Sequence, residues 1–201
     1  MKSQSTTSPL QGIARTLSIA LGHRDEHTSL HSNRVVQLSA ELGRHIGLSE
    51  TELELLALAA QFHDLGKIGI PDKILLKPAA FEQDEWACMK QHAIIGERII
   101  LAIEGEMTPI VAKAVRHHHE HFNGSGYPDK LQGTEIPLYS RIISVTDSYD
   151  AMVASRPYHR ARLHQEVMDI LTSESGSKHD PDLFHAFTAV IEQSEMRAPN
   201  T

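Results

Sequence analysis

Three consecutive histidines, at positions 117–119, run directly into a glycine-rich turn that ends at Pro128. Successive side chains on a helix point about 100° apart, so the three imidazoles cannot all face one spot, and at least one must be a bystander. Two adjacent ones can still hold two metals, or two sides of one. Gly124 and Gly126 permit positive φ and a close approach of the backbone to a bound group, while Pro128 biases Tyr127 towards extended geometry. The stretch predicts a metal site beside a ligand loop, against the plainer alternative of a polar helix end followed by an ordinary turn.

The cysteine count narrows the choice of metal ligands. The chain has 14 histidines and one cysteine, so Cys88 alone can build neither a disulfide framework nor a thiolate metal site. Any metal must therefore be held by histidines and carboxylates. This ligand set suits iron, manganese or zinc better than copper(I) or an iron–sulfur cluster.

Length, charge and hydropathy limit the class of protein. The 201 residues, 40% of them hydrophobic, suit one globular domain with a sizeable core. A net charge of −7 argues against binding of polymeric nucleic acid, which requires a broad basic face, but is compatible with a small anion attracted by metals. We find no signal peptide and no apolar run approaching the ~20 residues of a membrane span, so we expect a cytoplasmic protein.

Apolar residues recur at helical spacing along most of the chain, and we find no strand-like alternation, internal repeat or second domain. Gly47 and Ser49 mark a stop and a fresh N-cap, and Thr108 with Pro109 opens the helix that runs into the histidine cluster. Asp84 is expected to cap the helix that follows it. The expected helices cover residues 10–21, 25 onwards, 51–61, 85–103, 108 onwards, 138–154, 162–172 and 181–193.

A second group of candidate ligands, His63 and Asp64, follows the third expected helix and precedes residues 65–72, which we expect to form a loop. An adjacent imidazole and carboxylate can cap and bridge a metal, and Lys67 is placed to meet an anion. Read alone, such a pair is more often a helix-terminal histidine and a surface aspartate.

Single polar residues on apolar helices form the third group. His31 and His92 lie on otherwise apolar-patterned helices, where a histidine is more often a hydrogen-bonded core or surface residue than a ligand. Asp147 lies in an apolar stretch, and burying an unpaired carboxylate there would be costly, so it needs a metal or a cation as partner. Asp150, three residues on, shares its face and can orient ligands from behind.

Five segments occur in an order that is more informative than any one of them. They are His31-Ser32-Asn33-Arg34-Val35, His63-Asp64-Leu65-Gly66-Lys67, His92, His118-His119-Glu120 with Gly124-Ser125-Gly126-Tyr127-Pro128, and Asp147-Ser148-Tyr149-Asp150-Ala151. This series resembles the HD-GYP domain family over roughly residues 10–190. A single His-Asp pair would be a weak match, whereas the whole series in this order is not expected by chance.

The resemblance implies an all-α fold, a single HD-superfamily helical domain with a central metal site and a GYP loop. Residues 10–193 would form the HD-GYP domain, between a flexible N-terminal segment, 1–9, and a flexible C-terminal tail, 194–201. The resemblance also implies a metal-dependent phosphodiesterase that hydrolyses the bacterial second messenger cyclic di-GMP at a bi- or trinuclear centre. Signalling proteins such as diguanylate cyclase (GGDEF) domains are the macromolecular partners it suggests.

The resemblance assigns roles by position. Asp64 and Lys67 are the catalytic residues it implies. The metal ligands are His31, His63, Asp64, His92, His118, His119 and Asp147. The substrate-binding residues are Lys67, Gly124, Gly126, Tyr127 and Arg156.

Three departures from the family pattern affect these expectations. Members with three metals carry a glutamate one turn before the first histidine, where this chain has His27, so two metals are the default and a third at His27 stays open. His159 replaces a second basic residue after Arg156, and Arg160 can substitute for it. The sensor domain that usually accompanies the family is absent from this sequence, so the domain stands alone or has lost an upstream part.

Residue chemistry supports the same mechanism. Two divalent ions, iron or manganese, about 3.5–4 Å apart generate a bridging hydroxide near neutral pH and withdraw charge from the phosphodiester. Lys67 and Arg156 are suitable donors to the oxygens at phosphorus. Linear pGpG is the expected main product, because His27 offers a third cation less charge compensation than a carboxylate, and GMP should form slowly.

Three alternatives come from other classes. A nucleotidase or related phosphohydrolase of the wider HD superfamily is disfavoured by the Gly-Ser-Gly-Tyr-Pro loop. A diiron oxygenase is disfavoured by Lys67 and Arg156, which point to phosphate. A catalytically weak domain that acts as an interaction module, with Tyr127 and its loop as docking surface, is disfavoured by the complete set of ligands.

Overall fold

The computed structural model describes residues 9–22, 24, 26–154 and 161–200, without the side chains of residues 9–11, 14, 15, 18 and 26–29. The regular structure of these residues is helical, with no sheet. In chain order the elements are α1 (Pro9–Gly22), α2 (Glu26–His45), α3 (Glu50–Phe62), η1 (Leu65–Gly69), α4 (Asp72–Leu75), α5 (Gln83–Met89), α6 (Gln91–Leu101), α7 (Thr108–Arg116), η2 (Gly133–Glu135), α8 (Leu138–Val153), α9 (His164–Glu174) and α10 (Pro181–Ile191). The predicted all-α fold is confirmed.

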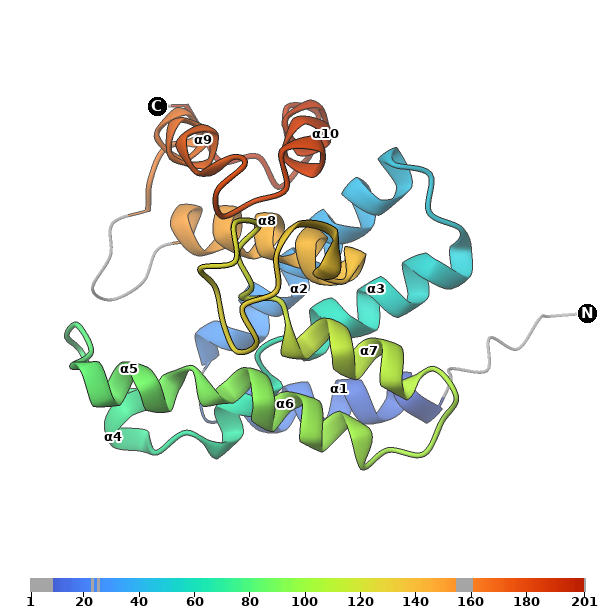
Figure 1. Ribbon diagram of the computed structural model, residues 1–201, viewed down its shortest axis with the longest axis vertical. Helices are drawn as coiled ribbons and strands as arrows, with labels where there is room; N and C mark the ends of the chain where they lie inside the picture. Colours follow the sequence, from blue (N-terminus) through green and yellow to red (C-terminus); the bar gives the residue numbers. More distant parts are fainter. Residues whose placement is uncertain (1–8, 23, 25, 155–160, 201) are drawn as a thin grey trace, which may run out of the picture.

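Helices α9 and α10 form one end of the molecule and α4, α5 and α6 the other, with α2, α7 and α8 between them (Figure 1). Helix α2 packs against α3 and α8, while α6 packs against α7 and η1. The main core fills the space between these helices, and its fully buried members include Leu38, Phe62, Ile142, Tyr149 and Phe187. Burying each such side chain contributes roughly 1.5–3 kcal/mol relative to leaving it exposed.

The expected helix boundaries hold where local chemistry decides them. Helix α2 gives way to a turn at Gly47, whose φ of 84° suits glycine. Ser49 then caps α3: its amide donates to the Glu52 carboxylate at 2.9 Å, and its side chain accepts from the Glu52 amide at 3.4 Å. This reciprocal pair is a capping box, which satisfies amides that a helix start leaves unpaired.

The prediction that Asp84 caps one helix over residues 85–103 is wrong on both counts. The helix begins at Gln83, with Glu82 as the cap residue and its amide donating to the Glu85 carboxylate at 2.8 Å. It also breaks at Lys90 into α5 and α6. His92 Nδ1 donates a hydrogen bond to the carbonyl of Met89 at 2.7 Å. This carbonyl lies at the end of α5, where the helix breaks.

Three smaller expectations also need correction. Thr108 is the first residue of α7 and not its cap, which is Met107. The helix ends at Arg116, so the three histidines lie in a turn after it rather than on it. Residues 65–72, expected to be a loop, include the 3-10 helix η1 and the start of α4. Arg24 holds this segment by bonding to the carboxylate of Asp72 at 2.7 Å and to carbonyls of η1.

The two ends of the chain differ in what the structure describes. Residues 1–8 of the expected flexible N-terminal segment lie outside the described residues. After α10, the amide of Ala198 donates to the Tyr149 hydroxyl at 3.0 Å, and the Pro199 carbonyl accepts from the His164 amide at 3.1 Å. These contacts tie residues 198–199 to α8 and α9. Among the described helices, none combines the length and the apolar character needed to cross a membrane.

Gly66 is the position where the fold tolerates a side chain least. A Cβ built there would lie 1.8 Å from the carbonyl oxygen of His92 and 2.5 Å from the amide nitrogen of Gly96, both backbone atoms of α6. We predict that Gly66→Ala lowers the free energy of unfolding by about 2 kcal/mol or more, because the two backbones must separate.

Gly12→Ala is the matched control, since a Cβ at Gly12 in α1 meets nothing within 4 Å. It should leave stability unchanged or raise it by up to ~1 kcal/mol through helix propensity. Denaturant unfolding of the two variants makes the comparison, and equal stability of both would contradict the close approach of η1 to α6.

Candidate metal centre

Backbone carbonyls at the ends of α3, α5 and α7 orient three histidine rings. His63 Nδ1 lies 2.7 Å from the Ala60 carbonyl, His92 Nδ1 2.7 Å from that of Met89, and His118 Nδ1 2.6 Å from that of Val115. In each case the carbonyl belongs to the residue three positions earlier. Because a carbonyl can only accept, each Nδ1 carries the proton of its ring and each Nε2 points away with a lone pair.

His31 is oriented by two carboxylates of α8 instead. Its Nδ1 donates to Asp150 at 2.6 Å and its Nε2 donates to Asp147 at 2.9 Å. Burial alone would lower the pKa of His31, but these two hydrogen bonds outweigh it and raise the pKa to about 9. Arg34 holds Asp150 from the other side, with Nε 2.6 Å from its carboxylate. Asp150 thus orients a ligand from behind, as its spacing from Asp147 predicts.

Asp64 lies between the remaining groups. Its carboxylate is 2.6 Å from Lys67 Nζ, 3.5 Å from His63 Nε2 and 3.8 Å from His92 Nε2. Burial would raise the pKa of Asp64, yet the Lys67 ammonium and the neighbouring imidazoles hold that pKa well below its usual range. Asp64 is therefore an ionised carboxylate at neutral pH, in the middle of the histidines.

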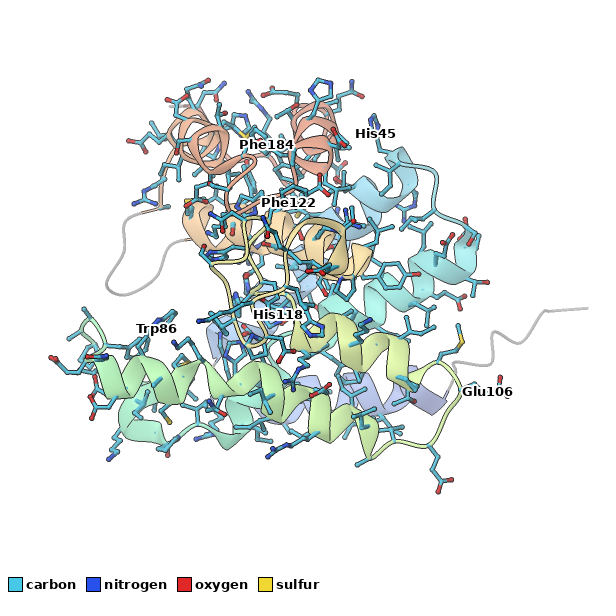
Figure 2. The ribbon with its side chains drawn as sticks, in the orientation of Figure 1. His45, Trp86, Glu106, His118, Phe122 and Phe184 are labelled. Carbon is cyan, nitrogen blue, oxygen red and sulfur yellow. The ribbon has the colours of Figure 1, made fainter. Side chains whose placement is uncertain are left out.

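All seven predicted metal ligands come together from separate elements. One set, formed by His31, His63 and Asp64, and another, formed by His92, His118 and His119, each have ligand atoms within 4.8 Å of one another. Asp147 joins the first set, with a carboxylate oxygen 2.9 Å from His31 Nε2. The rings of His63 and His118, 5.3 Å apart, connect the two sets. His118 lies in the middle of the molecule (Figure 2).

The ligand atoms are arranged for metal coordination rather than for hydrogen bonds among themselves. The Nε2 atoms of His92 and His118 face each other at 3.4 Å, and Nε2 of His63 is buried without a hydrogen-bond partner. Burial lowers the pKa of His92 and lowers that of His118 to about 3, so both rings are neutral and these atoms are bare acceptors. Leaving buried acceptors unpaired is costly, and divalent cations would satisfy them.

The ring of His119 lies beside the ring of its neighbour His118, with the ring centroids 3.9 Å apart. Burial and the neighbouring histidines hold its pKa well below the usual value, so it too is neutral. His117 lies outside these two sets: its Nε2 bonds to Asp129 at 2.8 Å, and Arg116 also holds that carboxylate at 2.6 Å.

The GYP loop, residues 124–128, lies beside this centre. Gly124 has a φ of 81°, and a Cβ at Gly126 would lie 2.2 Å from the amide nitrogen of His121, so both positions require glycine. The amide of Tyr127 donates to the His119 carbonyl at 3.2 Å, and its ring lies 4.9 Å from the His119 ring. Burial, with Asp64 and Asp147 nearby, raises the pKa of Tyr127 above its usual value, so its hydroxyl remains a donor.

The sequence analysis assigned no role to two residues that support the loop. The carboxylate of Glu120 accepts from the amides of Asp129 at 2.6 Å and Lys130 at 3.0 Å, and so fixes the exit of the GYP loop. Trp86, on α5, meets the ring of Tyr127 edge to face. The signal for Glu120 was its place between two predicted ligands and the glycines, and that for Trp86 was its being the only tryptophan.

Two candidates cannot be placed. Arg156 lies outside the described residues, and His27 lies within α2 but its side chain is not described.

The sequence is similar to those of known proteins. A family model described as HD domain matches residues 15–183. A cyclic di-GMP phosphodiesterase of Thermotoga maritima is 39% identical over 175 residues, covering 87% of this chain and 48% of that protein. The cyclic di-GMP phosphodiesterase response regulator RpfG of Xanthomonas campestris pv. campestris is 38% identical over 165 residues, covering 82% of this chain and 44% of that protein.

The fold also matches a solved structure. Bd1817, an HDG"Y"P protein from Bdellovibrio bacteriovorus, superposes with a TM-score of 0.66 at 20% identity, covering 82% of this chain and 52% of that one. The chain spans about half the length of the curated relatives it matches, 48% and 44% of the two above.

His63→Ala should remove at least one bound metal per chain, because the ring contributes a buried, unpaired Nε2 to the centre. His117→Ala is the matched control: it deletes a nearby imidazole whose two nitrogens are both bonded elsewhere, so metal content should not change. Elemental analysis after reconstitution with manganese measures both. Loss of metal from His117→Ala alone would contradict the assignment.

Metal binding should release a proton from His31. Its raised pKa, about 9, keeps both ring nitrogens protonated at neutral pH in the metal-free protein, and Nε2 must lose its proton to bind a metal. His92, His118 and His119 are already neutral and release none. Raising the pH from about 7 to about 9.5 should therefore lower the protons released by about one, measured by calorimetry in buffers of different ionisation enthalpy. An unchanged number would contradict the protonated state of His31.

Proposed function

The chain belongs to the HD domain family, and from that premise we propose that it is a metal-dependent phosphodiesterase that hydrolyses cyclic di-GMP. The match to the HD domain family model confirms the resemblance to HD-GYP proteins at the level of the family. The observation that carries the proposal is the pair of ligand sets within one buried centre, bordered by Lys67 and by the loop of Tyr127. The names of the relatives in Thermotoga and Xanthomonas support the choice of substrate.

Each of the two ligand sets would bind one of two metal ions. His31, His63, Asp64 and Asp147 would hold one side of the centre, and His92, His118 and His119 the other, with Asp64 between them. Two bound divalent ions would supply a nucleophile from water near neutral pH and neutralise charge on the phosphodiester. Imidazole and carboxylate donors suit iron or manganese, which we propose as the native metals.

The chain's own residues provide the remaining chemistry. The Lys67 ammonium lies 2.6 Å from Asp64, so it is held at the edge of the centre, where it can donate to a phosphate oxygen. The Tyr127 hydroxyl stays protonated and can donate to the substrate. Arg34 and Asp150 keep the His31 ring in one orientation. Arg156, together with the backbone at Gly124 and Gly126, completes the substrate contacts we propose.

Further expectations remain part of the proposal. We place the activity in the cytoplasm, and diguanylate cyclase (GGDEF) domains are the signalling partners we consider. A wider HD-superfamily nucleotidase fits less well, because the Gly-Ser-Gly-Tyr-Pro loop argues against it and its Tyr127 ring lies 4.9 Å from that of His119. A diiron oxygenase has no evident use for Lys67 beside a ligand carboxylate, and a binding module without activity has no need of seven convergent ligands.

A direct assay tests the proposal. Protein purified without oxygen and loaded with a known amount of manganese or iron is given cyclic di-GMP, and the products are separated over time. Turnover that depends on bound metal is the expected result. Absence of turnover in protein that carries two metals would overturn the phosphodiesterase and favour the binding module.

Lys67→Ala should keep the metals and lower kcat by roughly 10²-fold, because it removes a charged donor to the transition state and no ligand. Lys73→Ala is the control, since Lys73 is an exposed lysine of α4 in the neighbouring segment. Metal analysis and steady-state kinetics are measured on the same samples. Asp64→Ala, which removes a predicted ligand, is expected to lose metal. If Lys67→Ala loses metal as readily, the role of Lys67 is to hold Asp64 in place and not to contact the substrate.

Linear pGpG should accumulate as the main product, with GMP formed slowly. A neutral imidazole at position 27 compensates a third cation less well than a carboxylate, so a third metal should bind weakly. His27→Glu should strengthen that site and raise the rate of GMP formation, because positions 27 and 31 lie one turn apart on α2. Chromatography of timed samples with metal analysis measures this. Rapid GMP from unmodified protein with three metals per chain would instead make His27 a ligand.

A further inference from the structure

A row of aromatic rings leads outwards from the metal centre. It begins at His119, continues to Tyr127 at 4.9 Å between ring centroids, then to Trp86 at 6.2 Å, and ends at Phe81 at 6.1 Å. Its first member belongs to the ligand sets, and its last two lie outside them. The row therefore joins the place where a phosphodiester would be held to a surface that the metal chemistry does not use.

Trp86 is the exposed member of this row. It is 45% exposed, although a tryptophan of this size would normally be buried further. In Figure 2 it lies on the side of α5 that faces the rest of the domain. The Phe81 ring lies nearly parallel to the indole, at an interplanar angle of 18°, and the Tyr127 ring lies nearly perpendicular to it, at 81°. The two rings flank Trp86 and leave 45% of the residue exposed.

Phe81, the neighbour of Trp86, is itself supported by the core. It packs against a small hydrophobic cluster formed by Ile70, Ile74 and Met89, which are all buried. The indole therefore lies between a ring backed by this cluster and the Tyr127 ring of the GYP loop. A flat, apolar, fixed surface of this kind stacks nucleobases without needing base-specific hydrogen bonds.

We propose that Trp86, supported by Phe81 and Tyr127, forms an aromatic ledge that stacks a guanine base of the substrate. The proposal rests on the phosphodiesterase function above and adds a base-binding subsite to it. A dinucleotide whose phosphate lies at the metals has its bases one ribose away, and the ledge lies one ring beyond the loop residue that borders the metals. Lys90 Nζ, 5.8 Å from the Tyr127 ring centroid, adds a cation beside the ledge that suits the O6 and N7 acceptors of guanine.

The chain offers a direct optical test, because Trp86 is its only tryptophan. Titration of the metal-loaded protein with GMP and with pGpG should quench the fluorescence, since a stacked guanine contacts the indole. Ribose 5-phosphate carries the phosphate without the base and should leave the fluorescence unchanged. Equal quenching by ribose 5-phosphate, or none by either guanine ligand, would overturn the ledge.

Kinetics give a second, independent readout. Trp86→Ala should raise KM for cyclic di-GMP by about tenfold, as expected for one lost stacking contact, and leave kcat within about twofold. Trp86→Phe keeps a stacking ring and should raise KM by no more than about threefold. Leu101→Ala, which removes an exposed apolar side chain from the far end of α6, is the control and should change neither constant.

The outcomes separate the ledge from the proposed function. Metal-dependent turnover with an unchanged KM in Trp86→Ala overturns the ledge and leaves the phosphodiesterase standing. Quenching by GMP and pGpG without turnover of cyclic di-GMP supports the ledge and overturns the phosphodiesterase. A KM raised equally in Trp86→Phe and Trp86→Ala means that the effect is not stacking, and it also overturns the ledge.

Discussion

The last carbonyl groups of a helix have no partner within the helix, and in this domain three of them are taken by histidine rings. The carbonyls of Ala60, Met89 and Val115 each accept a hydrogen bond from Nδ1 of the imidazole three residues later. One bond therefore does two things: it satisfies a helix end, and it leaves Nε2 of the ring bare and aimed at the centre. Helices α3, α5 and α7 each end or break where their histidine is needed.

This arrangement places a dense group of polar side chains inside an apolar core, and its charges must be balanced. His31 carries a proton between Asp147 and Asp150, and Arg34 adds a second cation to Asp150. Asp64 is balanced by Lys67. Without metals, the buried carboxylates are thus stabilised by His31, Arg34 and Lys67. Loading the centre with cations replaces part of this balance, which links metal binding to proton release.

The GYP loop is held from both sides, and this makes it a fixed wall rather than a free loop. Phe122 and Asn123 donate their amides to the carbonyls of Lys178 and Ser177, in the connection between α9 and α10, at 3.0 and 2.9 Å. Glu120 fixes the loop exit through two further amides. The connection between α9 and α10, which carries none of the predicted ligands, therefore supports the loop that lies beside the candidate centre.

Sequence alone determined what depends on residue identity and short spacing. The all-α fold followed from helical periodicity and from the ordered series of motifs, and the cap at Ser49 from local chemistry. Helix geometry does not explain the different surroundings of the three histidines, because they lie in a turn after α7. Tertiary structure decided what depends on residues far apart in the chain. The break at Lys90 and the 3-10 helix at Leu65–Gly69 accompany the packing of η1 against α6. Trp86 reaches Tyr127 through tertiary packing as well: two positions separated along the chain meet only when α5 and the GYP loop come together, and no local pattern in the sequence encodes that contact.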